Sequence, residues 1–299
     1  MRVMTSAFTE TGLVSFRHAP LALSPSPHVP PNFDILTTML PTPSTSHVSF
    51  DRIYEPAEDT YLLLDTLSSE SESTFLRDRF DNTSLPTPPL VLEVGVGSGV
   101  VLAFVAANAC SILGRHDVLT LGTDLNRFAC QAASQTVRHA IEERKVDGRT
   151  VFLDVVNGDL ATALRPHSVD IFVFNPPYVP AELPDLSRHT DFNALAHGRS
   201  KTSFEQDSYL LELSYAGGED GMAVTDRMLE QVPDILSHGR GVAYVLLCAQ
   251  NKPDAVKKRI RGWGPGWQIE TVGSSGMKAG WEKLVVLRIW NGGPPDGKS

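Results

Sequence analysis

The chain has 299 residues, of which 41% are hydrophobic and 20% are charged, and it carries a formal net charge of −9. These values are typical of a globular protein with one sizeable α/β core and appendages. The acidic balance argues against a surface built to bind nucleic acid or an anionic membrane, and it favours a protein or small-molecule substrate. The longest apolar runs, at 100–107 and 242–249, fall far short of the roughly 18 to 20 residues that a membrane-spanning helix needs, so no membrane association is expected.

The N-terminal segment, residues 1–49, is rich in proline, serine and threonine and lacks a sustained hydrophobic period. We therefore expect a disordered arm, followed by a catalytic domain over 50–291 and a tail at 292–299. Its hydroxyl residues and two arginines resemble a mitochondrial transit peptide, but Glu10, Asp34 and the prolines disfavour the basic amphipathic helix of such a peptide.

The three cysteines are widely spaced and form no C-x-x-C pair of the kind that binds zinc, so no metal site is expected. Each lies in an apolar stretch, which predicts reduced core residues: Cys110, Cys130 and Cys248. Reduced cysteines are typical of a cytoplasmic protein, with the nucleus as a second compartment.

The stretch 54–64 predicts the start of the first helix, with Pro56 near its first turn. Three acids, Glu55, Glu58 and Asp59, lie where the helix dipole favours negative charge. Residues 68–89 follow, rich in serine, acids and proline, and they predict a variable connection. Neither segment by itself indicates chemistry.

A buried strand is predicted at 90–94, followed by the turn Gly95-Val96-Gly97-Ser98-Gly99 and an apolar helix over 100–109. Strand, glycine turn and helix are the start of a nucleotide-binding α/β unit, because glycine lets the backbone approach a ligand at a helix N-terminus. The spacing is G-x-G-x-G rather than the G-x-G-x-x-G that holds a pyrophosphate, which favours a nucleoside without phosphates.

Polar residues follow each of the next predicted strands. The strand at 118–123 ends at Asp124, the strand at 151–156 runs into Asn157-Gly158-Asp159-Leu160, and the strand at 169–174 ends at Asn175. In an open parallel sheet the carboxyl ends of the strands lie side by side and form the ligand crevice. Together with Gly95, these residues therefore predict one site, in which Asp124 is placed to bind both hydroxyls of a ribose.

The stretch Asn175-Pro176-Pro177-Tyr178 indicates what that site binds. Its prolines remove two backbone donors, so the neighbouring carbonyls are not consumed by sheet or helix hydrogen bonds. An amide oxygen, a free carbonyl and an aromatic face together suit a planar NH2 group. The alternative is an ordinary Pro-Pro loop after a buried strand.

The C-terminal half supplies a long polar segment and the remaining elements. Residues 181–214, with helical character near 208–215, are a candidate substrate-recognition flap over the Asn-Pro-Pro-Tyr site. Beyond it the pattern predicts a helix at 222–236, a buried strand at 241–249, a helix from Pro253 with a basic outer face, and an antiparallel hairpin formed by 268–272 and 284–290.

Six of these motifs occur together in a known family. The stretches EPAEDT, LEVGVGSG, GTDLN, NGDL, FNPPYVP and AQNKP resemble the HemK-like glutamine methyltransferases, with the closest likeness to the eukaryotic catalytic subunit that methylates the translation termination factor. The likeness covers roughly residues 39–290; residues 1–38 have no counterpart in it. It implies an α/β, Rossmann-like, seven-stranded class I methyltransferase fold, mostly parallel with a C-terminal antiparallel hairpin, that uses S-adenosyl-L-methionine.

The resemblance also implies site residues. Asp124 would bind the ribose, Asp159 the adenine amino group, and Glu93 would organise the methionine end. The implied cofactor-binding set is Thr60, Glu93, Gly95, Asp124, Asp159, Leu160 and Asn175. The implied substrate-binding set is Asn175, Pro176, Pro177 and Tyr178, of which Asn175, Pro176 and Tyr178 are the catalytic residues.

The resemblance implies two protein partners: the termination factor, whose Gly-Gly-Gln loop would be methylated on its glutamine, and a small zinc-binding activator subunit that adds a strand to the sheet edge. Three alternatives stay open. An adenine in DNA or RNA offers the same NH2 group, although the acidic net charge disfavours nucleic acid. A lysine is a poorer match to a planar slot, and a non-catalytic scaffold would not need the intact Asn-Pro-Pro-Tyr stretch.

Overall fold

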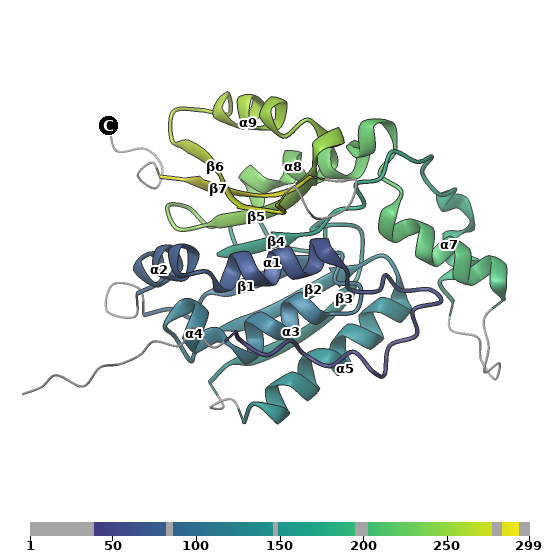
Figure 1. Cartoon of the computed structure of the whole chain (residues 1–299), viewed down its shortest axis with the longest axis horizontal. Helices are drawn as coiled ribbons and strands as arrows, with labels where there is room; N and C mark the ends of the chain where they lie inside the picture. Colours follow the sequence, from purple (N-terminus) through teal and green to yellow (C-terminus); the bar gives the residue numbers. More distant parts are fainter. Residues whose placement is uncertain (1–38, 82–85, 146–148, 195–202, 277–282, 293–299) are drawn as a thin grey trace, which may run out of the picture. The chain divides into compact units, whose positions relative to one another are not determined.

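A mixed seven-stranded sheet forms the centre of the unit that begins at Leu40 (Figure 1). The computed structural model describes residues 39–81, 86–145, 149–194, 203–276 and 283–292. The strand order is β3-β2-β1-β4-β5-β7-β6, with β1 to β5 parallel and β7 antiparallel to both β5 and β6. The predicted fold class is confirmed. The strands are β1 Leu90–Val94, β2 Leu119–Asp124, β3 Val151–Asn157, β4 Ile171–Phe174, β5 Val242–Cys248, β6 Trp267–Ser274 and β7 Leu284–Asn291.

Helices cover both faces of this sheet. On one face pack α1 to α5, and on the other pack α8 and α9 (Figure 1). The short α6 and the longer α7 belong to the segment between β4 and β5. The helices are α1 Glu58–Ser68, α2 Glu70–Arg79, α3 Val100–Ala107, α4 Ala109–Leu113, α5 Arg127–Glu143, α6 His189–Phe192, α7 Phe204–Tyr215, α8 Ala223–Ile235 and α9 Pro253–Arg261.

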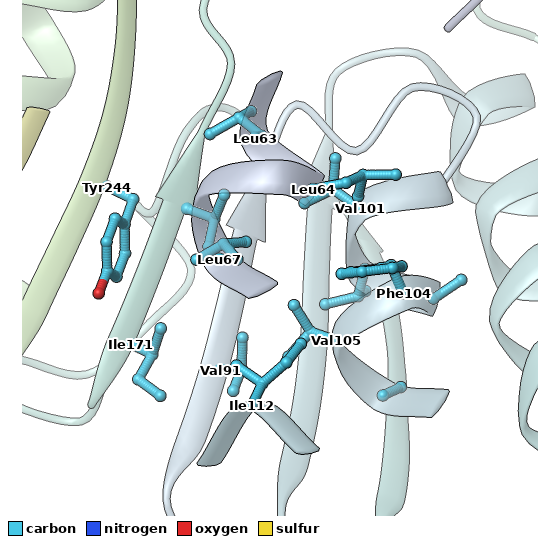
Figure 2. Close-up of a cluster of buried hydrophobic side chains, with 14 of the residues drawn as sticks. Leu63, Leu64, Leu67, Val91, Val101, Phe104, Val105, Ile112, Ile171 and Tyr244 are labelled. Carbon is cyan, nitrogen blue, oxygen red and sulfur yellow. The ribbon is translucent and has the colours of Figure 1, made fainter. Parts of the chain in front are cut away.

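Two hydrophobic clusters result from the alternation of side chains along the strands. In β4, Ile171 and Val173 face the cluster under α1 to α5, whereas Phe172 and Phe174 face the cluster under α8 and α9. Figure 2 shows the first cluster, where leucines of α1 meet Val91, Ile171 and Tyr244 of the sheet. Because both faces are covered, the central strands are mostly apolar, as the sequence predicts, and Glu93 of β1 is a buried exception.

The helix α2 corrects the prediction of a variable connection over residues 68–89. Ser69 caps this helix by accepting a hydrogen bond from the N–H of Glu72. Glu72 is buried and accepts hydrogen bonds from the hydroxyl of Tyr244 (2.9 Å) and from Arg288 (2.8 Å). An acid on the buried face of a helix hides the hydrophobic period, because its partners lie on distant strands.

The N-terminal boundary also differs from the prediction. Residues 1–38, most of the predicted arm, lie outside the described residues, but 40–49 pack on the catalytic domain. Val48 is buried in a small cluster with Ile53 and Ala129. Cys110 is exposed rather than part of the core, whereas Cys130 and Cys248 are buried, and all three are free thiols.

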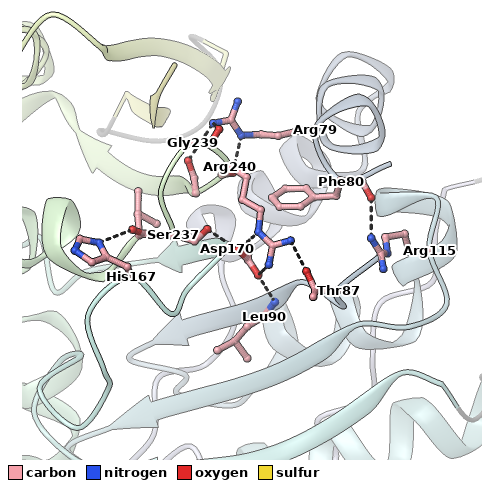
Figure 3. Close-up of polar contacts among 12 residues, drawn as sticks. Arg79, Phe80, Thr87, Leu90, Arg115, His167, Asp170, Ser237, Gly239 and Arg240 are labelled. Atoms are coloured by element: carbon pink, nitrogen blue, oxygen red, sulfur yellow. Dashed lines mark hydrogen bonds and ion pairs between the residues drawn. The ribbon is translucent and has the colours of Figure 1, made fainter. Parts of the chain in front are cut away.

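At the amino ends of the strands, a buried carboxylate joins three segments (Figure 3). Asp170 accepts hydrogen bonds from the N–H of Leu90 (2.9 Å), from the hydroxyl of Ser237 (2.5 Å) and from Arg240 at two oxygens (2.6 and 2.7 Å). The starts of β1, β4 and β5 are thereby tied together. No helix in the described part of the chain is long and apolar enough to span a membrane.

Candidate functional site

A cavity of about 260 Å³ opens at the carboxyl ends of β1, β2 and β4. All ten residues that the sequence predicts for the site line it: Thr60, Glu93, Gly95, Asp124, Asp159, Leu160, Asn175, Pro176, Pro177 and Tyr178. Strands that end side by side bring them together although they are spread over most of the catalytic domain. Their individual roles stay predictions.

The glycine turn after β1 packs tightly against α5. Gly99 has φ +78°, and a Cβ atom there would stand 2.5 Å from the Cα of Ala133. Glu93 is buried, and its Oε2 accepts a hydrogen bond from the N–H of Leu102 in the first turn of α3 (2.7 Å). Burial, with a smaller contribution from Asp124, raises the pKa of Glu93 well above its usual value. The carboxyl group of Glu93 therefore occupies a backbone donor at the start of α3 that a phosphate-binding site would leave free for its ligand.

Asp124, at the end of β2, is held by backbone donors. Its Oδ2 accepts a hydrogen bond from the N–H of Gly97 (3.0 Å), and its Oδ1 accepts one from the N–H of Asn126 (2.7 Å). Burial raises the pKa of Asp124 to about 6. Asp159, after the neighbouring strand β3, also lines the cavity. One of its oxygens is paired with Arg227, while its Oδ1 is buried without a partner among the described residues.

Asn175, directly after β4, carries a second acceptor without a partner. Its Nδ2 donates to Oδ2 of Asp59 in the first turn of α1 (3.0 Å), whereas its Oδ1 is buried and receives no hydrogen bond within the described part of the chain. Such an acceptor costs about 1–3 kcal/mol in a folded protein, so its presence at a cavity points to a ligand that donates. The carbonyl of Pro176 likewise accepts no hydrogen bond from the described residues.

Asp59 is a residue that sequence reasoning did not assign to the site. It is only 2% exposed and lines the cavity, and it also accepts a longer hydrogen bond from the hydroxyl of Tyr178 (3.4 Å). In the sequence, Asp59 was interpreted through the helix dipole and as part of the family motif EPAEDT, without a role in the site. Its neighbour Glu58 fits that interpretation, because Glu58 is exposed.

Asn251, a second residue that sequence reasoning did not assign to the site, holds the Asn-Pro-Pro-Tyr loop through a hydrogen bond to its backbone. Its Nδ2 donates to the carbonyls of Tyr178 (3.1 Å) and Asp220 (3.0 Å), and its Oδ1 accepts from the N–H of Cys248 (2.8 Å). At Gly221, where φ is +68°, a Cβ atom would stand 1.9 Å from the carbonyl oxygen of Tyr178. The signal for Asn251 is the AQNKP stretch, which served only to recognise the family.

The predicted flap borders the cavity with apolar side chains. Leu183 and Leu186 line it from the loop after β4, and both are about half exposed (45% and 55%). The helix α7 adds Leu210 and Leu213, and Phe174 of β4 closes the apolar wall. In the described part of the chain, no three or more potential metal ligands come together. The site therefore combines a polar floor of acids and unpaired acceptors with an apolar mouth.

Three relatives were compared with the chain. It is 32% identical over 256 residues to the "eRF1 methyltransferase catalytic subunit mtq2" of Schizosaccharomyces pombe, covering 84% of this chain and 96% of that protein. It is 33% identical over 251 residues to "Methyltransferase HEMK2" of Homo sapiens (83% and 95%). It is 28% identical over 241 residues to the "Putative protein N5-glutamine methyltransferase MJ0928" of Methanocaldococcus jannaschii (80% and 91%).

The chain was also compared with family models and with solved structures. No family model matches the chain. Among solved structures, the "METTL16 MTase domain (crystal form 2)" shares a TM-score of 0.45 and 12% identity, over 82% of this chain and 72% of that one.

The fold and the two long, well-covered alignments define the protein as a methyltransferase. The chain belongs to the family of HEMK2 and of the eRF1 methyltransferase catalytic subunit mtq2, and the HemK-like resemblance of its motifs is confirmed.

Proposed function

We propose that this chain methylates a glutamine side-chain amide of a translation termination factor, with S-adenosyl-L-methionine as the methyl donor. The observation that carries the proposal is the unpaired, buried Oδ1 of Asn175 at the cavity. The names of the relatives supply the substrate: two of them are described as an eRF1 methyltransferase subunit and a putative protein N5-glutamine methyltransferase.

The cavity fits the proposed cofactor. When bound, S-adenosyl-L-methionine supplies an electrophilic methyl group on a positively charged sulfur. Asp124 would accept hydrogen bonds from the ribose hydroxyls, and the unpaired Oδ1 of Asp159 would accept one from the adenine amino group. Asp59 places an acid at the remaining floor of the cavity, which suits a cationic ligand, and Glu93 lines the same cavity. Thr60, Gly95 and Leu160 complete the proposed cofactor wall, together with Asn175.

The substrate end of the site fits a primary amide. An amide nitrogen is a poor nucleophile because its lone pair is delocalised into the carbonyl. Oδ1 of Asn175 and the carbonyl of Pro176 would each accept one of its hydrogens, aim the nitrogen, and stabilise positive charge as it develops. One of these hydrogens then leaves as a proton to solvent. Pro177 and Tyr178 would wall the slot so that a planar group enters.

The pKa of Asp124 predicts how cofactor binding depends on pH. The ribose hydroxyl groups donate to the ionised carboxylate, so the Kd of S-adenosyl-L-methionine is expected to rise as pH falls through about 6. Well below this pKa, the rise approaches about tenfold per pH unit. Because this pKa is raised on folding, the same group has the opposite effect on stability: its contribution is full below the pKa of the unfolded chain and is lost as pH rises through about 6.

Isothermal titration calorimetry between pH 8 and pH 5 tests the binding prediction. The control is Asp124→Asn, which keeps the shape but cannot ionise; its binding is expected to be weaker at pH 8 and almost independent of pH. A wild-type Kd that stays constant over this range would contradict the role proposed for Asp124.

The open edge of the sheet supports a partner. β3 is an edge strand, and its Val151 and Leu153 are 42% and 46% exposed. Among the described residues, no strand pairs with the outer side of β3. Exposed apolar residues on such an edge favour strand addition by another chain. We propose that this edge receives the small zinc-binding activator subunit that the resemblance implies. Asp154, which is exposed, follows Leu153 on the same strand.

Transfer of labelled methyl from S-adenosyl-L-methionine to the termination factor tests the function, with the activator subunit present. Label is expected on the wild-type factor, and none on a factor whose Gly-Gly-Gln glutamine is replaced by alanine. Replacement of this glutamine by glutamate is the matched control, because glutamate keeps the shape but has no NH2 group. No label on the wild-type factor, with the cofactor bound, would overturn the proposal and direct attention to adenine and lysine substrates.

A further inference from the structure

The amide of Asn175 can face the cavity in two ways that have almost the same shape. One orientation presents Oδ1, an acceptor, and the other presents Nδ2, a donor. Only the first can receive a hydrogen from a substrate NH2 group. The function proposed above therefore depends on the orientation of the Asn175 side-chain amide, and neither the backbone nor the shape of the surrounding packing decides it.

The carboxylate of Asp59 decides between these orientations. A carboxylate only accepts hydrogen bonds, so the group of Asn175 that faces it must be the donor. Nδ2 of Asn175 lies 3.0 Å from Oδ2 of Asp59, and Oδ1 is thereby turned the other way and left unpaired among the described residues. A flipped amide would place two acceptors against each other. The hydroxyl of Tyr178 points to the same oxygen of Asp59 (3.4 Å).

The other oxygen of Asp59 is fixed as well. Oδ1 accepts hydrogen bonds from the N–H of Thr60 (2.6 Å) and from its hydroxyl (3.2 Å). The backbone N–H can only donate, so an oxygen must remain at this position in any isosteric variant. Among the described residues, no basic side chain forms an ion pair with Asp59, although it is only 2% exposed. A buried acid without a counter-ion is uncommon unless it serves a site.

We propose that Asp59 is the positioning residue that sets Asn175 as a hydrogen-bond acceptor for the substrate amide. This inference rests on the proposed function, and it adds to it a residue that acts through Asn175. The same carboxylate would hold Tyr178 in place, so that one side chain at the start of α1 orients two residues of the Asn-Pro-Pro-Tyr loop.

The variant Asp59→Asn tests the proposal because it reverses one hydrogen bond without changing the shape. The N–H of Thr60 keeps the oxygen of the introduced amide in place, so its NH2 group faces Asn175 and forces the amide of Asn175 to flip. We expect kcat to fall by about 10²-fold, because an oriented acceptor at the reacting group is lost. The melting temperature is expected to stay close to the wild-type value, and the Kd of S-adenosyl-L-methionine is expected to rise by no more than about tenfold, because one acid of the cavity floor is neutralised.

A second substitution is expected to restore part of the activity. In the double variant Asp59→Asn with Asn175→Asp, the new carboxylate accepts from the amide at position 59 and presents its other oxygen to the slot. Its kcat is expected to be at least about tenfold above that of Asp59→Asn alone, as expected when two residues act as a unit. Glu58→Gln is the matched control, because it removes the exposed acid of the same turn, and wild-type kcat is expected.

The full chain with its activator subunit serves for the kinetic test, and the glutamine-containing termination factor is the substrate. A folded Asp59→Asn variant with kcat within about threefold of wild type would overturn the proposal, because the loss expected for an oriented acceptor is far larger. Should the wild type itself transfer no methyl to glutamine, the proposed function fails, and the orientation of Asn175 is then decided by its side-chain amide signals in ¹⁵N NMR. The NH2 proton of Asn175 that is hydrogen-bonded to the carboxylate of Asp59 is expected to be shifted in the wild type and to lose that shift in Asp59→Asn. Identical signals in both proteins would overturn the inference.

Discussion

Replacing Asn175 by alanine is expected to lower kcat for methyl transfer by about 10²- to 10³-fold, the loss seen when one oriented polar group is removed from a reacting centre. The variant lacks the buried Oδ1 that would hold and align the substrate amide. The Kd for S-adenosyl-L-methionine is expected to rise by no more than about tenfold, since a single hydrogen bond is removed from a ligand with many contacts. The measurement is kcat at saturating substrate, together with calorimetric binding of the cofactor.

The control for this variant is Gln250→Ala, which removes an exposed amide on the turn after β5, outside the cavity. It is expected to keep the wild-type kcat. Thermal unfolding of Asn175→Ala must accompany the kinetics, because Asp59 loses one of its hydrogen-bond donors in this variant. Turnover unchanged from wild type in a folded Asn175→Ala protein would rule out the proposed mechanism.

The second large effect is on stability and concerns the opposite end of the strands. Asp170→Ala is expected to reduce the free energy of unfolding by about 3–5 kcal/mol, the usual result of removing one partner from a buried ion pair. The side chain is 3% exposed and accepts four hydrogen bonds, so Leu90, Ser237 and Arg240 would all lose an acceptor (Figure 3). For a chain of this size the melting temperature is expected to fall by roughly 10 °C.

A double-mutant cycle separates the ion pair from its surroundings. Arg240→Ala leaves the carboxylate of Asp170 buried without its cation, and the double variant is expected to be destabilised by about 0.5–3 kcal/mol less than the sum of the two single variants. Asp254→Ala removes an acid that is 99% exposed and is expected to change stability by less than about 0.5 kcal/mol. Additive effects of Asp170→Ala and Arg240→Ala would contradict the coupling.

Most of the sheet could be predicted because its signals are local. The central strands are buried on both faces, so most of their residues are apolar, and Ile171–Phe174 is apolar without interruption. A glycine turn follows β1, and polar residues lie at or directly after the ends of β2, β3 and β4; parallel pairing brings those ends to one edge. The positions of Gly95, Asp124, Asp159 and Asn175 around one cavity follow from these two facts.

The missed elements depend on partners that are far away in the sequence. The helix α2 buries Glu72 against Arg288, which lies 216 positions further along the chain, and no local pattern distinguishes such an acid from an exposed one. Asn251 was missed for the same reason, because its contacts with Tyr178 and Asp220 join three separate loops.

By itself, the sequence determined the fold class, the family and ten of the residues that line the cavity, because strand period, strand-end chemistry and short motifs are all written in adjacent residues. The tertiary structure decided how those residues act. Asp59 and Asn175 are 116 positions apart, and only their contact at 3.0 Å shows which end of the amide faces the cavity. An amide has the same shape in both orientations, so its direction depends on the partner that folding places beside it.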